Sequence, residues 1–95
     1  MTNEQILSVA TKYESELVGY PAERQDHGSP PGGRESALRH ARWMCQQIPV
    51  HLTAGNTGKA MRWLGFIQGV LWTSGAKSIG TMREDNTGKA VPATA

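Results

Sequence analysis

Residues 59–72 read KAMRWLGFIQGVLW and predict a helix with almost no face suited to water. At helical spacing, one stripe holds Ala60, Leu64, Ile67 and Leu71. The flanking stripes add Trp63, Val70, Met61 and Trp72. One neighbouring helix cannot cover stripes that point in three directions. We therefore expect this helix to lie at the centre of a bundle or to be shared between subunits.

Two glycines interrupt this apolar helix and leave gaps in its surface. Gly65 and Gly69 are separated by three residues, so they lie on the same side one turn apart. Without side chains they allow another backbone to approach closely, and close helix packing is the simpler interpretation. A flat ligand resting on the glycine surface is the alternative.

The chain has 95 residues, which is the length of one small domain. A domain of this size buries only about 60 to 65% of its unfolded surface, so oligomerisation is an expected source of extra stability. Cys45 is the single cysteine and excludes an internal disulfide. His40, Cys45 and His51 do not match the spacing of a metal site, and the sequence implies no metal and no cofactor.

The sequence predicts neither secretion nor a membrane span. Residues 1–5 are acidic and precede no apolar stretch of signal-peptide length. The apolar part of the 59–72 segment is interrupted by Arg62 and Gln68 and is shorter than the roughly 20 residues that a bilayer requires. A reducing, cytoplasmic compartment fits these features and the unpaired cysteine.

Capping and breaking signals predict four helices. Thr2 and Gln5 have capping-box spacing, and Gly19 is expected to end the first helix. Pro49 is expected to end or kink the second helix, with one further turn at 50–52 as the alternative. Ser78 resembles an N-cap of the last helix. The predicted ranges are 3–18, 35–48, 57–73 and 78–85.

The last helix is short, and its faces are assigned from spacing alone. Ile79 and Met82 are expected to face inward. Glu84 and Asp85 are adjacent acids that we place on a solvated turn.

The predicted fold is therefore all-α, with three main helices and a short C-terminal helix in a homo-oligomer. One helical domain spans residues 1–86 and contains a long Pro/Gly-rich loop at 20–33. Residues 87–95 are predicted to be a flexible tail.

Charge is distributed unevenly along the chain. Residues 1–33 hold two bases against five acids, and residues 34–77 hold six bases against Glu35 alone. The basic half favours an anionic partner such as a phosphate, a nucleotide or an acidic protein surface. Attraction between the two halves, within the fold or between subunits, is the alternative explanation.

The leading hypothesis for function is a homo-oligomer that binds a small anionic ligand, most concretely a nucleotide held at subunit interfaces, without turning it over. Side chains of arginine and lysine supply charge, aromatic rings supply a stacking surface, and an amide contacts the edge of a base. The candidate ligand-binding residues are Tyr20, Arg24, Arg34, Arg39, Arg42, Trp43, Lys59, Arg62 and Gln68.

Two segments resemble a family of small tailed-phage proteins. They are HARWMC at 40–45 and KAMRWLGFIQGVLW at 59–72. Members carry an H-x-x-W-M-C helix, then a KAMRWLGF-x-QG-x-LW helix, then a short Ile/Met helix that ends in Asn, which corresponds here to 79–86. The resemblance implies a helical phage accessory protein in the host cytoplasm. Such proteins often inhibit host enzymes or host immunity, in some cases by sequestering nucleotide signals.

Other classes of function are less favoured by the sequence. A phage inhibitor that docks on a host protein is the main alternative, because interfaces favour the Trp, Tyr and Arg anchors that this chain has. Nucleic acid is a weaker candidate partner, since the basic half has no recognisable recognition helix. An enzyme is not expected, because no nucleophile, base and orienting group can be placed together.

Overall fold

The computed structural model describes residues 1–88, and these residues form four helices and no strands. The helices are α1 (Asn3–Glu16), α2 (Arg34–Thr53), α3 (Thr57–Thr73) and α4 (Ile79–Thr87). The predicted all-α fold, with three main helices and a short last one, is confirmed. Of the predicted tail, Thr87 is the last residue of α4, and residues 89–95 lie outside the described part.

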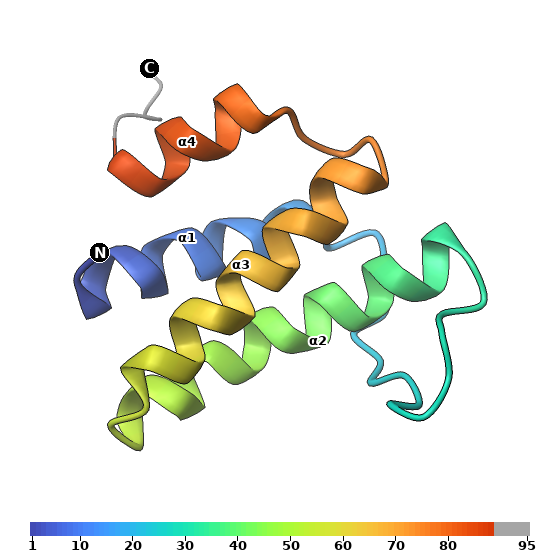
Figure 1. Ribbon diagram of the computed structural model, residues 1–95, viewed down its shortest axis with the longest axis horizontal. Helices are drawn as coiled ribbons and strands as arrows, with labels where there is room; N and C mark the ends of the chain where they lie inside the picture. The colour runs from blue at the N-terminus through green and yellow to red at the C-terminus, as the bar shows by residue number, and fades with distance from the viewer. Residues whose placement is uncertain (89–95) are drawn as a thin grey trace.

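The three long helices pack against one another, and α4 packs on α1. In Figure 1, α3 crosses in front of α1 and α2, while α4 lies at the top of the view, beside α1 and away from α2. The long loop between α1 and α2 bends around the first turns of α2. This arrangement places the loop beside α2 and α3, on the side of the bundle opposite α4. None of the described helices is long and apolar enough to cross a membrane.

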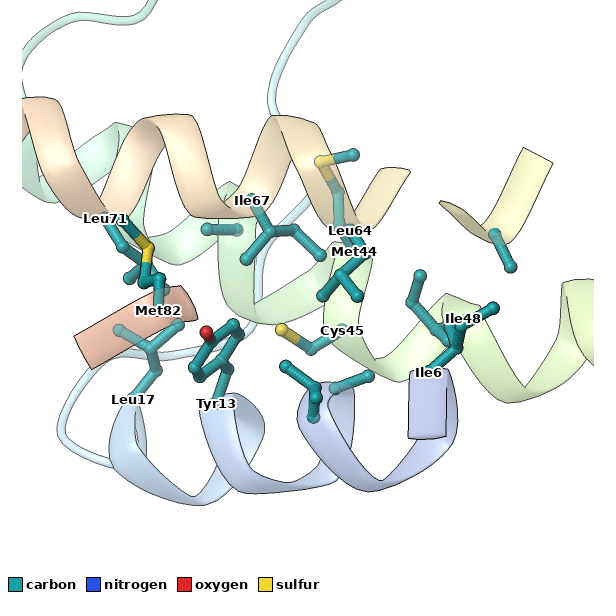
Figure 2. Packing of buried hydrophobic residues seen from close by; sticks show 14 of the residues in the cluster. Ile6, Tyr13, Leu17, Met44, Cys45, Ile48, Leu64, Ile67, Leu71 and Met82 are labelled. Carbon is teal, nitrogen blue, oxygen red and sulfur yellow. The ribbon is translucent and has the colours of Figure 1, made fainter. Parts of the chain in front are cut away.

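One stripe of α3 supplies its share of the core. Ala60, Leu64, Ile67 and Leu71 are buried, as the spacing predicted. They meet fully buried side chains of α1 and α2 (Figure 2). These include Ile6, Tyr13, Leu38 and Ile48.

The rest of the α3 surface is only partly covered by its own chain. Trp63 and Val70 pack against the edge of the core. Met61, Phe66 and Trp72 are 44%, 56% and 53% exposed. The protomer therefore hides one stripe of α3 and leaves an outer face on which these apolar side chains lie beside the exposed Arg62 and Thr73.

The predicted N-terminal caps of α1 and α4 are confirmed. Thr2 Oγ1 accepts from Gln5 N at 3.1 Å, and Thr2 N donates to Gln5 Oε1 at 2.7 Å, which completes the capping box. Ser78 Oγ accepts from Thr81 N at 3.1 Å.

The end of α1 differs from the prediction. The helix ends at Glu16, with Leu17 as its C-cap, and Gly19 does not adopt the left-handed conformation of a glycine cap. Leu17 is 4% exposed. The helix ends where Leu17 packs into the core, so Gly19 is not needed as a left-handed C-terminal cap.

Pro49 neither ends α2 nor limits it to residue 48. The helix continues to Thr53, so the alternative of a further turn at 50–52 is the correct one. Ile48 is fully buried on one side of the proline, and Leu52 packs against the core on the other. These contacts hold helical geometry on both sides, and the missing N–H of Pro49 removes a single helical hydrogen bond.

The faces of α4 were predicted only in part. Met82 is buried as expected, but Ile79 is 49% exposed. Asp85 is buried, whereas Glu84 is exposed, so the prediction of two acids on a solvated turn is wrong for Asp85. The inward side of α4 therefore carries a charge.

Asp85 is held by cations and by a tyrosine. Its carboxylate accepts from Lys12 Nζ at 2.6 Å and from Tyr13 Oη at 2.8 Å, and Lys77 Nζ lies 3.2 Å away. Burial alone would raise the pKa of Asp85, but these three partners outweigh it and lower the pKa below its ordinary value. Lys77 also pairs with Glu16 at 2.9 Å. The cluster fastens α4 and the α3–α4 connection to α1.

Cys45 offers a simple test of the core. Its thiol is 2% exposed, and burial raises its pKa to about 12, so almost no thiolate forms near neutral pH. We expect Ellman's reagent to modify Cys45 at the rate at which the protein unfolds and to react quickly in denaturant. Rapid modification of the folded protein in buffer would contradict this packing.

Candidate functional site

A groove of about 400 Å³ lies between the α1–α2 loop, α2 and α3. The loop contributes polar groups to one wall, and the two helices contribute rings and aliphatic side chains to the other. The lining residues are Gln25, Asp26, His27, Ser29, Pro31, Ala37, His40, Met44, Trp63, Phe66 and Val70. The volume falls within the range of small-molecule sites, roughly 300 to 1,000 Å³.

Aromatic rings form a continuous row beside the groove. The row runs from the loop through α2 to α3 and back to the end of α2. Its centroid separations are 5.4 Å for His27–His40, 5.4 Å for His40–Trp43, 5.9 Å for Trp43–Trp63 and 4.4 Å for Trp63–His51. Such a row gives the groove stacking surfaces in a fixed arrangement.

Backbone atoms of the loop are tied to α2. Arg42 donates to the carbonyl oxygen of Tyr20 at 2.6 Å. Glu23 N donates to Arg39 O at 3.2 Å, and Gln25 N donates to His40 Nδ1 at 3.0 Å. These bonds explain why a loop rich in proline and glycine has a defined position.

Three of the predicted ligand-binding arginines have partners within the protein. Arg42 pairs with Glu14 at 2.8 Å, and Arg39 pairs with Glu35 and with Glu23. Arg34 donates to Ser74 O at 2.9 Å and to Tyr20 Oη at 3.2 Å. The structure thus brings Tyr20, Arg34 and Arg42 together, but their described contacts hold the loop in place.

The same ion pairs explain the uneven charge of the chain. Acids of residues 1–33 meet bases of residues 34–77 in the pairs Glu14–Arg42, Glu16–Lys77 and Glu23–Arg39. Attraction between the two halves, the simpler of the two sequence interpretations, therefore operates within the fold. These ion pairs neutralise Arg42 and Arg39, two of the arginines that were predicted to bind a ligand.

The remaining predicted cations lie near the aromatic row. The guanidinium of Arg24 lies 5.8 Å from the ring centre of Trp43, and Lys59 Nζ lies 5.5 Å from that of Trp63. Arg62 is exposed on α3, one turn before Phe66. None of the three cations lines the groove, but Arg24 contacts the lining residue His27. The guanidinium of Arg62 lies over Gly58, on the side away from Phe66. Asp26 is the acid among the groove-lining residues, and its oxygens accept from Gly28 N and Ser29 Oγ.

Gln68 faces a different part of the molecule. Its amide nitrogen donates to Tyr13 Oη at 3.1 Å and to Asn86 Oδ1 at 2.7 Å. It therefore extends the polar cluster around Asp85 and is absent from the residues that line the groove. Burial, the largest cause, raises the pKa of Tyr13 far above its ordinary value, so this phenol stays protonated.

None of the nine predicted ligand-binding residues is among the residues that line the groove, and the lining residues His40 and Phe66 were not predicted. The contact of His40 with Gln25 depends on the path of the loop. Phe66 lies on the same stripe of its helix as Arg62, and this shared stripe was the one sequence feature that pointed to Phe66 as a site residue. The groove itself needs residues from three segments, so no local pattern predicts it.

The groove combines aromatic and aliphatic side chains of α2 and α3 with polar groups of the loop. Among the described residues, no group of three His, Cys, Asp or Glu side chains could hold a metal ion. Burial lowers the pKa of His40, with the charges of His27 and Arg24 acting in the same direction. Comparisons of the chain with protein-family models, with curated proteins and with solved structures find no match.

Proposed function

We propose that this protein binds a small anionic ligand with a flat ring, most concretely a nucleotide signal, in the groove and does not turn it over. The observation that carries this proposal is the groove of about 400 Å³ lined by Trp63, Phe66 and His40. Arg24 contacts the lining residue His27, and Lys59 lies over the ring of Trp63. The resemblance to small tailed-phage proteins supports a role in the host cytoplasm, where sequestering an immune signal would counter host defence.

The groove suggests an orientation for such a ligand. A base would stack on Phe66, whose side chain is 56% exposed, and on the accessible part of Trp63. Its phosphate would lie toward Arg24 or Lys59, or toward Arg62 once that exposed side chain turns from Gly58 toward Phe66. Because Arg34, Arg39, Arg42 and Tyr20 have partners within the protein, we assign them the role of holding the loop that forms one wall of the groove. Gln68 belongs to the polar cluster around Asp85 and has no part in the groove.

The ligand proposal is tested with a panel of linear and cyclic nucleotides, using thermal shift and then calorimetry. We expect at least one nucleotide to raise the melting temperature. We expect Arg62→Ala and Phe66→Ala each to weaken its binding by about tenfold, in line with 1 to 3 kcal/mol per stacked base. Both side chains are exposed, so the fold should tolerate their loss.

Two matched variants on α4 serve as controls. Arg83→Ala and Ile79→Ala remove an exposed base and a half-exposed apolar side chain that lie outside the groove. Both should leave affinity unchanged. If no nucleotide binds, or if the α3 and α4 variants behave alike, the ligand proposal is wrong.

We further propose that the outer face of α3 is covered by a second copy of the chain. Gly65 and Gly69 have open space above them, since a Cβ at either position would meet no atom within 4 Å. Glycine inside a helix is destabilising by about 1 kcal/mol relative to alanine. Two glycines that no neighbour within the protomer requires therefore favour a close contact with another molecule. Met61 and Trp72 lie beside them with exposed apolar surface, on the side of α3 away from the groove residue Phe66.

A host protein is the second candidate for this face. The exposed Trp72 and Phe66 are the kind of side chains that anchor protein interfaces. A stoichiometric host protein recovered with wild-type bait and lost with Trp72→Ala would favour inhibition by docking. Recovery that is equal for both baits would contradict it.

A further inference from the structure

We propose that residues 24–29 form a proton-sensitive lid over the groove, held closed by the neutral imidazole of His40 and released when that imidazole gains a proton. The opening of the lid is a property of the protein without ligand. One consequence rests on the proposed function: below neutral pH the groove loses its loop wall and therefore its ligand.

The closing contact requires a particular form of the imidazole. Gln25 N–H donates to His40 Nδ1 at 3.0 Å, and a backbone amide cannot accept in return. His40 Nδ1 must therefore be unprotonated, which places the proton of the neutral ring on Nε2. A protonated ring would direct an N–H at the N–H of Gln25, so the bond would be lost and replaced by repulsion.

This contact is the main polar tie of the lid. Among the hydrogen bonds of residues 1–88, it is the one that joins residues 24–31 to a helix. The other bonds of this segment are local, for example Gln25 Nε2 to Glu23 O and Gly28 N to Asp26 Oδ1. Loss of this bond leaves the ring contacts of His27 with His40 and of Arg24 with Trp43 to hold the segment, while Glu23 N to Arg39 O marks its fixed end.

The charges around His40 disfavour the addition of a second proton to its ring. From the loop, Arg24 and His27 face the same region, and Arg24 Nη2 lies 3.1 Å from His27 Nδ1. Asp26 is the loop acid at the groove, and its oxygens accept from Gly28 and Ser29. From α3, the groove-lining residues Trp63, Phe66 and Val70 are uncharged. On α2, the neighbouring Arg39 pairs with Glu35 and Glu23.

The direction of the pH dependence follows from linkage. Burial, with help from His27 and Arg24, lowers the pKa of His40 in the closed state. The open state therefore binds more protons, and closure is most favourable above the ordinary pKa of histidine, about 6.5. Closure weakens as pH falls from there toward the lowered value.

Amide hydrogen exchange measured by NMR tests the lid directly. Between about pH 7.5 and about pH 5, we expect protection of the Gln25 amide, corrected for intrinsic exchange, to fall by roughly tenfold. The Ile67 amide in the core reports global unfolding and should lose much less protection. In His40→Asn, the side-chain oxygen can accept from Gln25 N at every pH, so protection should stay constant over the same range.

Two results would overturn the proposal. One is constant protection of Gln25 in the wild type, and the other is an equal fall in wild type and His40→Asn. If His40→Asn does not fold, the ¹⁵N chemical shifts of the wild-type His40 ring report its tautomer and its protonation instead. The lid requires the Nε2–H form above about pH 7 and a Gln25 amide shift that titrates together with His40; independent titration would refute it. Neither readout involves a ligand, so failure of nucleotide binding leaves the lid intact.

Discussion

Asp85→Ala is expected to destabilise the protein by about 3 kcal/mol, because removing one partner of a buried ion pair leaves the others uncompensated. The Asp85 side chain is fully buried, and its loss leaves Lys12 without this partner and removes one of the two acids that hold Lys77. Tyr13 would lose the acceptor of its buried hydroxyl. Urea unfolding followed by circular dichroism measures the difference.

Glu84→Ala is the matched control, because Glu84 is the adjacent acid in the same helix and is exposed. Its loss should change stability by less than about 0.5 kcal/mol. Equal effects of the two substitutions would contradict the structural role of Asp85.

The Asp85 cluster also predicts the response to acid. The lowered pKa of Asp85 means that its contribution to stability is complete above the ordinary carboxyl pKa, about 4. That contribution is lost as pH falls through the lowered value. The difference in unfolding free energy between wild type and Asp85→Ala should therefore be constant from about pH 7 to pH 5 and shrink below about pH 4.

The double substitution Gly65→Ala, Gly69→Ala should have opposite effects on the protomer and on its assembly. Both glycines lie inside α3 with open space above them, so alanine should stabilise the folded protomer by about 1 to 2 kcal/mol in total. In a close α3–α3 contact the added methyl groups would force the backbones apart. We expect the dissociation constant of the assembly to rise by roughly 30-fold, about 2 kcal/mol.

Gly80→Ala tests whether this effect belongs to α3. Gly80 lies in α4, and a Cβ there would meet only Ser78 Oγ, at 3.9 Å. This variant should not change association. Unfolding measured at high dilution separates protomer stability from assembly, and sedimentation velocity gives the dissociation constants. Association that is unaffected by the α3 pair would place the interface elsewhere.

Local patterns predicted the helices well because each helix has its own signals. The apolar stripe of α3 and the caps at Thr2 and Ser78 depend on residues within a few positions of one another. The errors arise where a distant segment decides the outcome. Helix α2 continues through Pro49 because the core holds Ile48 and Leu52, and no local rule includes that contact.

The candidate site was less predictable than the helices for the same reason. Asp85 finds Lys12 and Tyr13 more than 70 positions away, so an acid that looked solvated is buried. Arg42 appeared free for a ligand because its partner Glu14 belongs to another helix. Composition shows that positive charge is present, whereas only tertiary structure shows how much of it is already paired.

Sedimentation equilibrium of the wild-type protein over a wide concentration range tests the central claim most directly, since that claim is that a second copy covers the outer face of α3. We expect a species of at least twice the 10.3 kDa mass of the chain, with Trp72 shielded from an aqueous quencher in that species. A 10.3 kDa protomer at every concentration, with Trp72 fully open to the quencher, would contradict it.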